Sequence, residues 1–536
     1  MGVSLEKIYN KKKEQKFANM VQESRTRKTF LNARVNLIFY FLTLLLSFFS
    51  RKIFLDILGA DFVGLTTTLQ NLLSFLNIAE LGISGAIAYV LYKPLFEHNQ
   101  QRINEIISVL GYLYRWVGII ILTSGCFISI FLPVFFSETN FSLSIIYFAY
   151  YSFLTSSLIG YFINYRQTLL SADQKNYVVT AYFQTGNILM TIIQMISAYY
   201  TQSYYLWITI TLFYGIVYSV ILNWKINQVY PWLKSEIKIG KKLLGKYPEV
   251  IKLTKQIFVH KLGGLVQIQL TPFLVYAFIS LEAVALFTNY TLLIDKIKLI
   301  FTNFLGSTTA SVGNLIAENN KERILKTYWE LLTIRFFFVG ISTFVLYNCT
   351  HLFILLWLGE DYVLSNTILI LVLITFCLNI IRGTTDEFIS GYGLFGDIYS
   401  PIIEIIIFAL SSLLGGYYWG IEGLLLGSII STISVIYCWK PYYLFTKGFK
   451  INIWKYWISF SKYILLTLIS FYISDSINQV VLNDFYISLQ WYSLILKAFI
   501  SFVNISFIYY IVLYVSTDGM KNLTHRILIF LLRKPR

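Results

Sequence analysis

The sequence predicts an all-α protein that crosses a membrane about fourteen times. Of its 536 residues, 57% are hydrophobic and only 13% are charged, whereas a soluble domain carries about 25% charged residues. A helix needs about 20 apolar residues to cross the hydrocarbon core, and runs of that length recur between residues 32 and 516. No polar stretch is long enough to fold separately, which argues against a soluble enzyme or a nucleic-acid binder.

The apolar runs between polar breaks are the expected spans. The first six cover 32–50, 62–92, 105–136, 142–169, 177–200 and 204–224. The others cover 257–280, 283–307, 328–348, 365–390, 401–418, 420–439, 456–474 and 491–516. We therefore expect two pseudo-symmetric six-helix lobes, 32–224 and 257–444, with the last two helices in 445–516. Basic segments cover 1–31, 225–256 and 517–536.

The basic residues predict the orientation of the chain. Most of the 43 Lys and Arg residues lie in segments on one side of the expected membrane, as the positive-inside rule requires of cytoplasmic loops. Both termini are therefore expected in the cytoplasm. The net charge of +16 then faces anionic lipids rather than nucleic acid. Part of the linker 225–256 is expected to be an amphipathic helix on the cytoplasmic surface, and the alternative is a solvated basic loop.

An internal repeat supports two related lobes. The loop 97–103 (EHNQQRI) resembles 318–324 (ENNKERI), and the two follow the second and the eighth expected span. Parallel repeats of this kind place a substrate cavity between the halves of a transporter and allow alternating access.

Charged residues inside the spans are the candidate site, because each costs at least about 2.5–3.5 kcal/mol near the centre of the membrane. Lys and Arg bind phosphate and pyrophosphate through charge-assisted hydrogen bonds, so a hydrated cationic cavity for a lipid-linked pyrophosphate is predicted. Acids there could balance charge, bind sugar hydroxyls or carry a coupling ion. The candidate cations are Arg51, Arg166, Lys261, Lys296, Lys298 and Arg382, and the candidate acids are Glu80, Asp295, Asp386, Glu387 and Glu404.

Mutual neutralisation is the alternative explanation of these charges. Asp295 is three residues from Lys298, and Arg382 is four residues from Asp386, so each pair shares a helix face. Lys296 has no obvious local partner, which favours a functional role for its span. Interfacial snorkelling explains Arg51 and Lys52 equally well. It is the favoured reading for Arg115 and Arg335, which lie nearer the ends of their spans.

Neither a cofactor nor a metal is expected. The four cysteines and four histidines show no metal-ligand or paired spacing. The longest outer breaks, 349–364 and 475–490, are too short to fold as an enzymatic domain. We therefore expect a transporter with no catalytic residue, whose coupling ion, H⁺ or Na⁺, the sequence does not identify.

Several strings resemble polysaccharide-unit flippases, and their order along residues 51–404 makes the resemblance specific. A small departure is Thr288 before Asn289-Tyr290, where such proteins more often have Ser. The strings are RKIF at 51–54, FLNIAELGI at 75–83, RQTLLSADQK at 166–175, Asn289-Tyr290, SVGN at 311–314, and GLF at 393–395 before Pro401 and Glu404.

These flippases belong to the multidrug/oligosaccharidyl-lipid/polysaccharide exporter superfamily, which also holds multidrug and toxin extrusion transporters and lipid II flippases. The resemblance implies translocation of undecaprenyl-pyrophosphate-linked oligosaccharide across a bacterial cytoplasmic (inner) membrane, for O-antigen, capsule or exopolysaccharide. Arg51, Glu80, Arg166 and Glu404 are the positions that match by motif. The expected partners are this glycan, anionic membrane lipids, and the polysaccharide polymerase and chain-length machinery.

The main competing function is a multidrug or cation antiporter of the same superfamily. A site for a cationic ligand would favour acidic and aromatic groups. This chain instead mixes many basic residues with its acids and has two additional spans, so the flippase is the preferred hypothesis.

Overall fold

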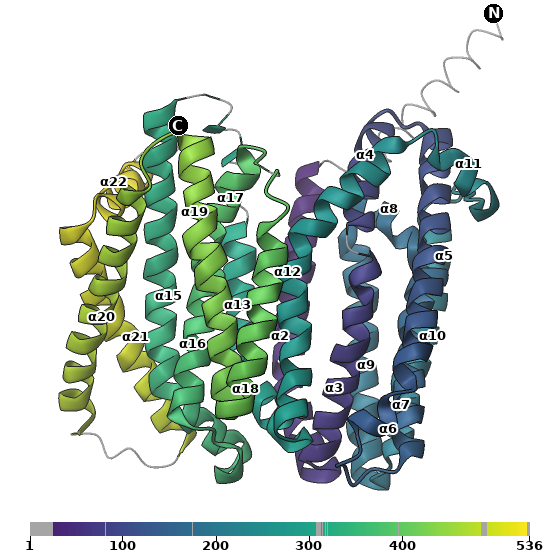
Figure 1. The fold of residues 1–536 in the computed structure, drawn as a ribbon, viewed down its shortest axis with the longest axis horizontal. Helices are drawn as coiled ribbons and strands as arrows, with labels where there is room; N and C mark the ends of the chain where they lie inside the picture. Colours follow the sequence, from purple (N-terminus) through teal and green to yellow (C-terminus); the bar gives the residue numbers. More distant parts are fainter. Residues whose placement is uncertain are drawn as a thin grey trace, which may run out of the picture. The chain divides into compact units, whose positions relative to one another are not determined.

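The computed structural model describes residues 25–80, 82–173, 175–306, 312–313, 315–316, 318, 320–394, 396–483 and 490–532. Helices dominate this part of the chain, and it contains no strand (Figure 1). Within it, nine helices are long and apolar enough to cross a membrane, and one of these, 400–449, holds two of the expected spans. The prediction of an all-α, polytopic membrane protein is confirmed.

The described helices form two compact units. Unit 1 contains the residues up to Leu58 together with Leu76–Ile257, and unit 2 contains Gly59–Phe75 and Phe258–Arg536. The division by lobes expected from the repeat places all of 32–224 in one half, whereas contacts assign the short segment from Gly59 to unit 2. Most of the expected segment 1–31 lies outside the described residues, as do the last residues of the tail 517–536.

Unit 1 is built from helices that pack against one another. The largest contacts join α2 to α9, α10 to α7 and α9, and α5 to α7 and α4. Its elements are α2 (Arg25–Leu58), η1 (Asn77–Glu80), α4 (Ile83–Phe96), α5 (Gln100–Ser129), α6 (Leu132–Phe135), α7 (Leu143–Phe162), η2 (Asn164–Arg166), α8 (Gln167–Ala172), α9 (Asn176–Thr201), α10 (Tyr204–Val229), η3 (Ile237–Ile239) and α11 (Gly240–Leu244). Helix α12 (Pro248–Phe278) starts in unit 1 and continues into unit 2.

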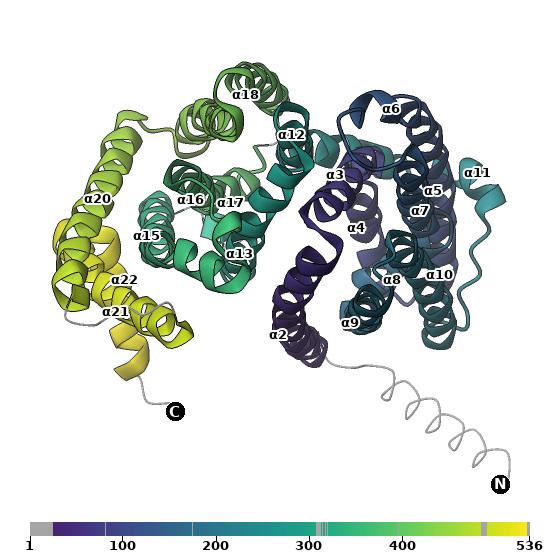
Figure 2. The same cartoon turned by 90° about the horizontal axis from the view of Figure 1, so that it is seen from below.

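Unit 2 is organised around α15, which contacts α16, α21 and α22. Figure 2 shows α20, α21 and α22 gathered on one side of this unit. Its elements are α3 (Ala60–Leu76), α13 (Leu281–Gly306), α15 (Lys321–Leu358), η4 (Glu360–Tyr362), α16 (Asn366–Ile381), α17 (Gly383–Gly391), α18 (Ser400–Thr432), η5 (Ile433–Trp439), α19 (Lys440–Tyr443), η6 (Leu444–Phe449), α20 (Trp454–Asn483), α21 (Trp491–Ser516) and α22 (Asp518–Leu532).

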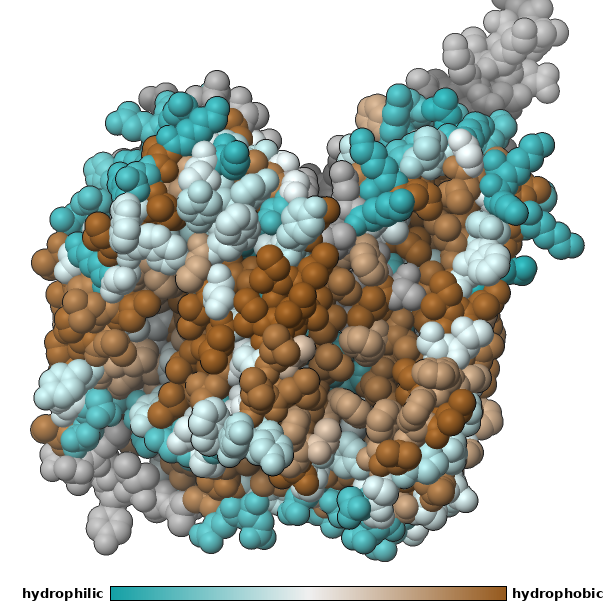
Figure 3. Space-filling model, in the orientation of Figure 1, coloured by the Kyte–Doolittle hydropathy of each residue, from teal (hydrophilic) through white to brown (hydrophobic). Residues whose placement is uncertain are grey.

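Apolar side chains cover the flanks of the helices. On the face drawn in Figure 3 hydrophobic residues cover the middle of each unit, and hydrophilic residues gather toward the helix ends. On α2, for example, Leu37, Phe41, Leu45 and Phe49 are all exposed and recur every four residues, so they lie on one face of the helix. Such continuous apolar surface requires lipid rather than water. The chain is a multi-pass membrane protein.

The expected second span, 62–92, is divided between the units. Helix α3 ends at Leu76, the 3₁₀ turn η1 follows, and α4 begins after Gly82. Gly82 has φ 92°, a left-handed conformation that glycine adopts without steric penalty. The apolar pattern continues through this break, which is why the sequence suggested one helix.

The repeated loops have the same local structure in both units. Asn99 caps α5 by accepting a hydrogen bond from the Arg102 amide at 3.0 Å, and Asn320 caps α15 by accepting one from the Arg323 amide at 3.1 Å. In each loop an acid two residues before the cap forms an ion pair with the arginine whose amide is capped. Glu97 Oε2 lies 3.7 Å from Arg102 Nη1, and Glu318 Oε2 lies 2.5 Å from Arg323 Nη1. The sequence repeat is therefore a repeated helix start.

The linker segment 230–247, which we call the basic strap, is attached to α5. Its helical content is limited to η3 and α11, so it is neither a long surface helix nor a free loop. The Lys234 amide donates to Asn104 Oδ1 at 2.8 Å, and the Glu236 amide donates to Ser108 Oγ at 2.9 Å. These hydrogen bonds hold the strap against the first turns of α5.

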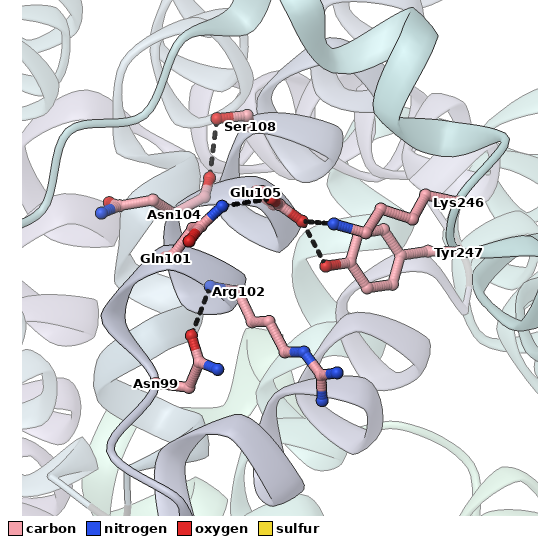
Figure 4. Close-up of polar contacts among 8 residues, drawn as sticks. All are labelled: Asn99, Gln101, Arg102, Asn104, Glu105, Ser108, Lys246 and Tyr247. Carbon is pink, nitrogen blue, oxygen red and sulfur yellow. Dashed lines mark hydrogen bonds and ion pairs between the residues drawn. The ribbon is translucent and has the colours of Figure 1, made fainter.

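Glu105 fastens the end of the strap (Figure 4). Lys246 Nζ lies 2.6 Å from Glu105 Oε2, and the Tyr247 hydroxyl donates to the same oxygen at 2.7 Å. Burial and this hydrogen bond raise the pKa of Tyr247 well above its ordinary value. Tyr247 therefore keeps its proton and remains a donor at a pH where a free tyrosine ionises.

A tight hairpin separates the eleventh and twelfth expected spans. Gly420 (φ 56°) reverses the chain inside α18, at the boundary predicted between 418 and 420. The two arms then meet at glycines: a Cβ on Gly423 would overlap the backbone carbonyl of Gly415. Small residues allow this backbone contact in a membrane protein.

Replacing Gly423 by alanine should therefore destabilise the hairpin by about 1–3 kcal/mol or more, the range for overpacked sites. We expect a lower thermal midpoint for the detergent-solubilised protein, measured by the fraction that remains monodisperse after heating. Gly160→Ala is the matched control, because nothing lies within 4 Å of a Cβ there. Equal midpoints for the two variants would contradict the packing described.

Glu105→Gln should loosen the strap, because charge-assisted hydrogen bonds are worth about 1.5–3 kcal/mol each. We expect amide hydrogen exchange over 237–247 to accelerate about tenfold, since 1.4 kcal/mol is a factor of ten in an opening equilibrium. Glu249→Gln, a nearby exposed acid, serves as the control and should leave the exchange unchanged. Unaltered exchange in the Glu105 variant would show that the carboxylate does not hold the strap.

Candidate functional site: a polar cavity and its charge clusters

Unit 2 contains a polar cavity of about 380 Å³. Helices α3, α12, α13, α16 and α18 supply its walls, and charged side chains reach it from α13 and from the junction of α16 and α17. Its charged lining residues are Asp295, Lys298 and Arg382, and its polar lining residues are Asn71, Gln267, Thr271, Thr288, Thr291, Thr375, Asn379 and Ser428. Three of the candidates from the sequence thus share one cavity.

The α13 charges form a loose pair. Lys298 Nζ lies 3.9 Å from Asp295 Oδ1, and the Asp295 side chain is 66% exposed, so this contact neutralises the lysine only weakly. Lys296 also interacts electrostatically with Asp295. The expectation that Lys296 lacks a local partner is therefore wrong. Unlike its neighbours, Lys296 is not among the residues that line the cavity.

Arg382 belongs to a second, more enclosed cluster. Its Nε lies 2.9 Å from Asp386 Oδ2, which confirms the pairing expected from their spacing, while Lys440 Nζ lies 3.0 Å from Asp386 Oδ1. Glu404, on α18, is only 4% exposed and interacts electrostatically with Arg382 and Lys440. Within the described part of the chain, Glu404 Oε1 has no hydrogen-bond partner. We call these four residues the α17 cluster.

Lys440 is the member that the sequence did not identify. Lys440 follows the apolar run 420–439. Because a basic residue ordinarily marks the end of a span, the sequence places Lys440 in the cytoplasmic segment after that run. The π-helical turn η5 comes directly before Lys440, and the Lys440 ammonium group contacts Asp386 on α17. The cluster contains two cations and two acids, so its formal charges balance, and Arg382 is the member that also lines the cavity.

A buried ion pair joins α15 to α17. Arg335 Nη2 lies 2.6 Å from Glu387 Oε1, and the two side chains are 7% and 8% exposed. Arg335 also donates to the Ile380 carbonyl at 3.1 Å. Gly383 makes room, since a Cβ there would lie 2.5 Å from Arg335 Nη1. The expectation that Arg335 snorkels to the interface is wrong, because a partner on another helix neutralises it in place.

Arg166, in unit 1, is held by neutral partners. Arg166 donates to Asn227 Oδ1 at 2.9 Å and to Asn223 Oδ1 at 2.7 Å, so α10 fixes its guanidinium without cancelling its charge. Arg51 lies half-buried on α2. The side chain of Lys261 lies outside the described residues, although its backbone is part of α12.

Glu80 is surrounded by hydroxyl groups. Ser84 Oγ donates to Glu80 Oε1 at 2.5 Å, and the Tyr114 hydroxyl donates to the same oxygen. The Tyr161 hydroxyl lies 3.0 Å from Glu80 Oε2 and 2.9 Å from Asn77 Oδ1. This carboxylate is therefore positioned by α4, α5 and α7 without a cation within ion-pair distance in the described structure.

The donor chemistry of these clusters is that of anion and hydroxyl recognition. In the described part of the chain, no group of three or more His, Cys, Asp or Glu residues could hold a metal ion. All four cysteines are free. The cavity of unit 2 can offer two cations, several amides and several hydroxyls to a polar ligand.

No protein-family model matches the sequence, and no curated protein matches it either. Solved structures do match. The lipid II flippase MurJ, in an inward closed conformation, aligns with a TM-score of 0.61 over 89% of this chain and 98% of that chain, at 17% identity. An inward-facing multidrug resistance MATE family transporter of the MOP superfamily aligns with a TM-score of 0.55 over 77% of this chain and 97% of that chain, at 13% identity. These similarities identify the fold.

Removing one partner of the buried Arg335–Glu387 pair should destabilise the protein more than replacing both partners. Arg335→Met removes the cation that faces the buried Glu387 carboxylate, which we expect to destabilise the protein by about 3–5 kcal/mol, whereas Arg335→Met combined with Glu387→Met should regain most of this loss. Thermal midpoints in detergent measure both variants. The exposed pair Glu318–Arg323, 49% and 62% exposed, is the control, and its removal should cost less than about 1 kcal/mol. A double variant no better than Arg335→Met would contradict this prediction.

Proposed function

We propose that this chain, which has the fold of the exporter superfamily of lipid II flippase and MATE transporters, is a lipid-linked oligosaccharide flippase. It moves undecaprenyl-pyrophosphate-linked repeat units from the inner to the outer leaflet of a bacterial cytoplasmic membrane, for surface polysaccharides such as O-antigen or capsule. Both termini are cytoplasmic in this proposal. The observation that supports this proposal most directly is the polar cavity of unit 2, with Lys298 and Arg382 in its lining.

A pyrophosphate group requires cations that line the cavity. Lys298 has only a long contact with Asp295, at 3.9 Å. Arg382 contacts Asp386, which it shares with Lys440, and interacts electrostatically with Glu404, but it also lines the cavity. Both can therefore form charge-assisted hydrogen bonds to phosphate oxygens, and the planar guanidinium can form two in parallel.

The rest of the cavity suits a sugar. Amide and hydroxyl side chains such as Gln267, Thr271 and Asn379 line it, and these groups can both donate to and accept from sugar hydroxyls. Its volume of about 380 Å³ lies in the range of about 300–1,000 Å³ that holds small-molecule ligands. We propose that it receives the part of the head group nearest the pyrophosphate, while the lipid tail stays in the bilayer.

The other candidate residues complete the proposal. Arg51 and Arg166 are proposed to contact the head group from the amino-terminal lobe during alternating access, as is Lys261 from α12. Lys296 would add to the positive potential around Lys298. The acids Glu80, Asp386, Glu387 and Glu404 are proposed to balance charge or to carry a coupling ion, H⁺ or Na⁺. The expected partners, a polysaccharide polymerase and chain-length machinery, would receive the translocated units.

Removing the cavity cations should abolish transport without unfolding the protein. We expect Lys298→Gln and Arg382→Gln to lower surface polysaccharide at least about tenfold, since each lost charge-assisted contact is worth about 1.5–3 kcal/mol. Arg166→Gln and Lys296→Gln should reduce it as well. Quantitative immunoblotting must show unchanged protein levels. Lys241→Gln, on the exposed surface of the strap, is the charge-matched control. Normal polysaccharide in all four variants would overturn the cavity model.

The substrate class is tested by depleting the protein in its native cell and analysing lipid extracts by mass spectrometry. A pyrophosphate-linked oligosaccharide should accumulate on the cytoplasmic face of the membrane. The same cells should be assayed for efflux of cationic dyes. Loss of dye efflux with no lipid-linked intermediate would instead support the multidrug or cation antiporter.

A further inference from the structure

A second polar pocket lies in unit 2, and the proposed transport cavity does not account for it. It has a volume of about 380 Å³ and is formed by the beginnings of α15, α20 and α22 with the end of α21. Figures 1 and 2 show α20, α21 and α22 lying beside one another in this unit. None of its lining residues lines the transport cavity.

Three lysines from two helices share the lining of this pocket. Lys326 comes from α15, while Lys455 and Lys462 lie two turns apart on α20. Lys462 Nζ donates to the Ser516 carbonyl at 2.6 Å, which fixes its ammonium group without neutralising it. The acids of the lining are Glu322 and Asp518. In the described structure no ion pair joins either acid to these lysines. Lys326 also interacts electrostatically with Glu330, and three lysines against two lining acids leave the pocket with a net charge of +1.

The position of α22 shows that the pocket is a built feature. Gly519 packs so closely that a Cβ would overlap Thr333 Oγ1 and lie 2.9 Å from the Trp329 carbonyl oxygen. Farther along the helix, Arg526 Nη2 lies 2.7 Å from Glu330 Oε2, and the Glu330 side chain is only 3% exposed. Because loss of this contact would leave a buried carboxylate unpaired, α22 is held firmly against α15.

The surroundings match the headgroup level of a membrane. Trp329 and Tyr463 line the pocket, and Trp454, one residue before Lys455, is 66% exposed. Aromatic residues of this kind concentrate at the boundary between hydrocarbon and headgroups. A basic pocket between helices at that level fits the phosphate of an anionic lipid.

We propose that this pocket binds a phosphate group, that of an anionic phospholipid such as phosphatidylglycerol, through Lys326, Lys455 and Lys462. The ligand joins α15 to α20, beside the start of α22, and so fixes α20 to α15. This site is independent of the transported substrate, because it uses neither Lys298 nor Arg382.

Binding is tested on the purified, delipidated full-length protein by native mass spectrometry and by thermal shift. Phosphatidylglycerol should bind and raise the thermal midpoint, whereas phosphatidylcholine, which carries no net charge, should do so at least about tenfold less well. Lys326→Gln with Lys455→Gln should weaken phosphatidylglycerol binding at least about tenfold. Lys326→Arg with Lys455→Arg should retain binding and shows that the site tolerates substitution. Lys241→Gln with Lys242→Gln, on the strap, is the charge-matched control and should bind as the unaltered protein does.

Inorganic phosphate distinguishes the two sources of the ligand. If phosphate alone raises the midpoint and phosphatidylglycerol adds nothing, the pocket binds free phosphate rather than a lipid, still through the same lysines. Equal phosphatidylglycerol binding in the glutamine variant and the unaltered protein would overturn the proposal. None of these measurements depends on transport, so the flippase proposal can fail while this one holds.

Discussion

The structure of unit 2 depends on the high free energy of a charge that is buried in hydrocarbon without a partner. Each deeply placed cation in its centre meets a carboxylate from another turn or another helix. Arg335 of α15 meets Glu387 of α17, and Lys440 of α19 meets Asp386 of α17. These contacts fix α17 between its neighbours. They also explain the glycine at the start of α17, because Gly383 leaves the space that the Arg335 guanidinium occupies.

The junction of α16 and α17 also belongs to the candidate site. Arg382, between the two elements, lies in the wall of the polar cavity, while Asp386, one turn later, contacts Lys440. A structural ion-pair cluster and a ligand cavity thus share one residue. In unit 1 two of the charged candidates contact neutral groups instead of opposite charges: hydroxyls surround Glu80, and asparagines hold Arg166. Neutral partners satisfy hydrogen bonds but leave the charge in place, which suits residues proposed to act on an ion or an anionic ligand.

Features of the sequence that depend on neighbouring residues were readable in advance. The spans follow from apolar runs, the capped helix starts after 99 and 320 follow from the repeated loop, and the reversal at Gly420 follows from the boundary between two runs. The Arg382–Asp386 pair was predictable because four residues is one helical turn. Contacts between distant segments were not. Arg335 and Glu387 are far apart in the sequence, and the pattern around each alone gave no sign that they meet.

The sequence by itself determined that this is an all-α membrane protein, where its apolar helices run, and which charges need an explanation, because hydrophobic length and the cost of charge burial are local properties. Only the tertiary structure decided which of those charges share a cavity. It separated Asp295, Lys298 and Arg382 from Lys296, turned Arg335 into a buried partner of Glu387, and brought Lys440 into the α17 cluster. The physical reason is that neutralisation and cavity lining depend on helix rotation and packing, which periodicity along one helix does not specify.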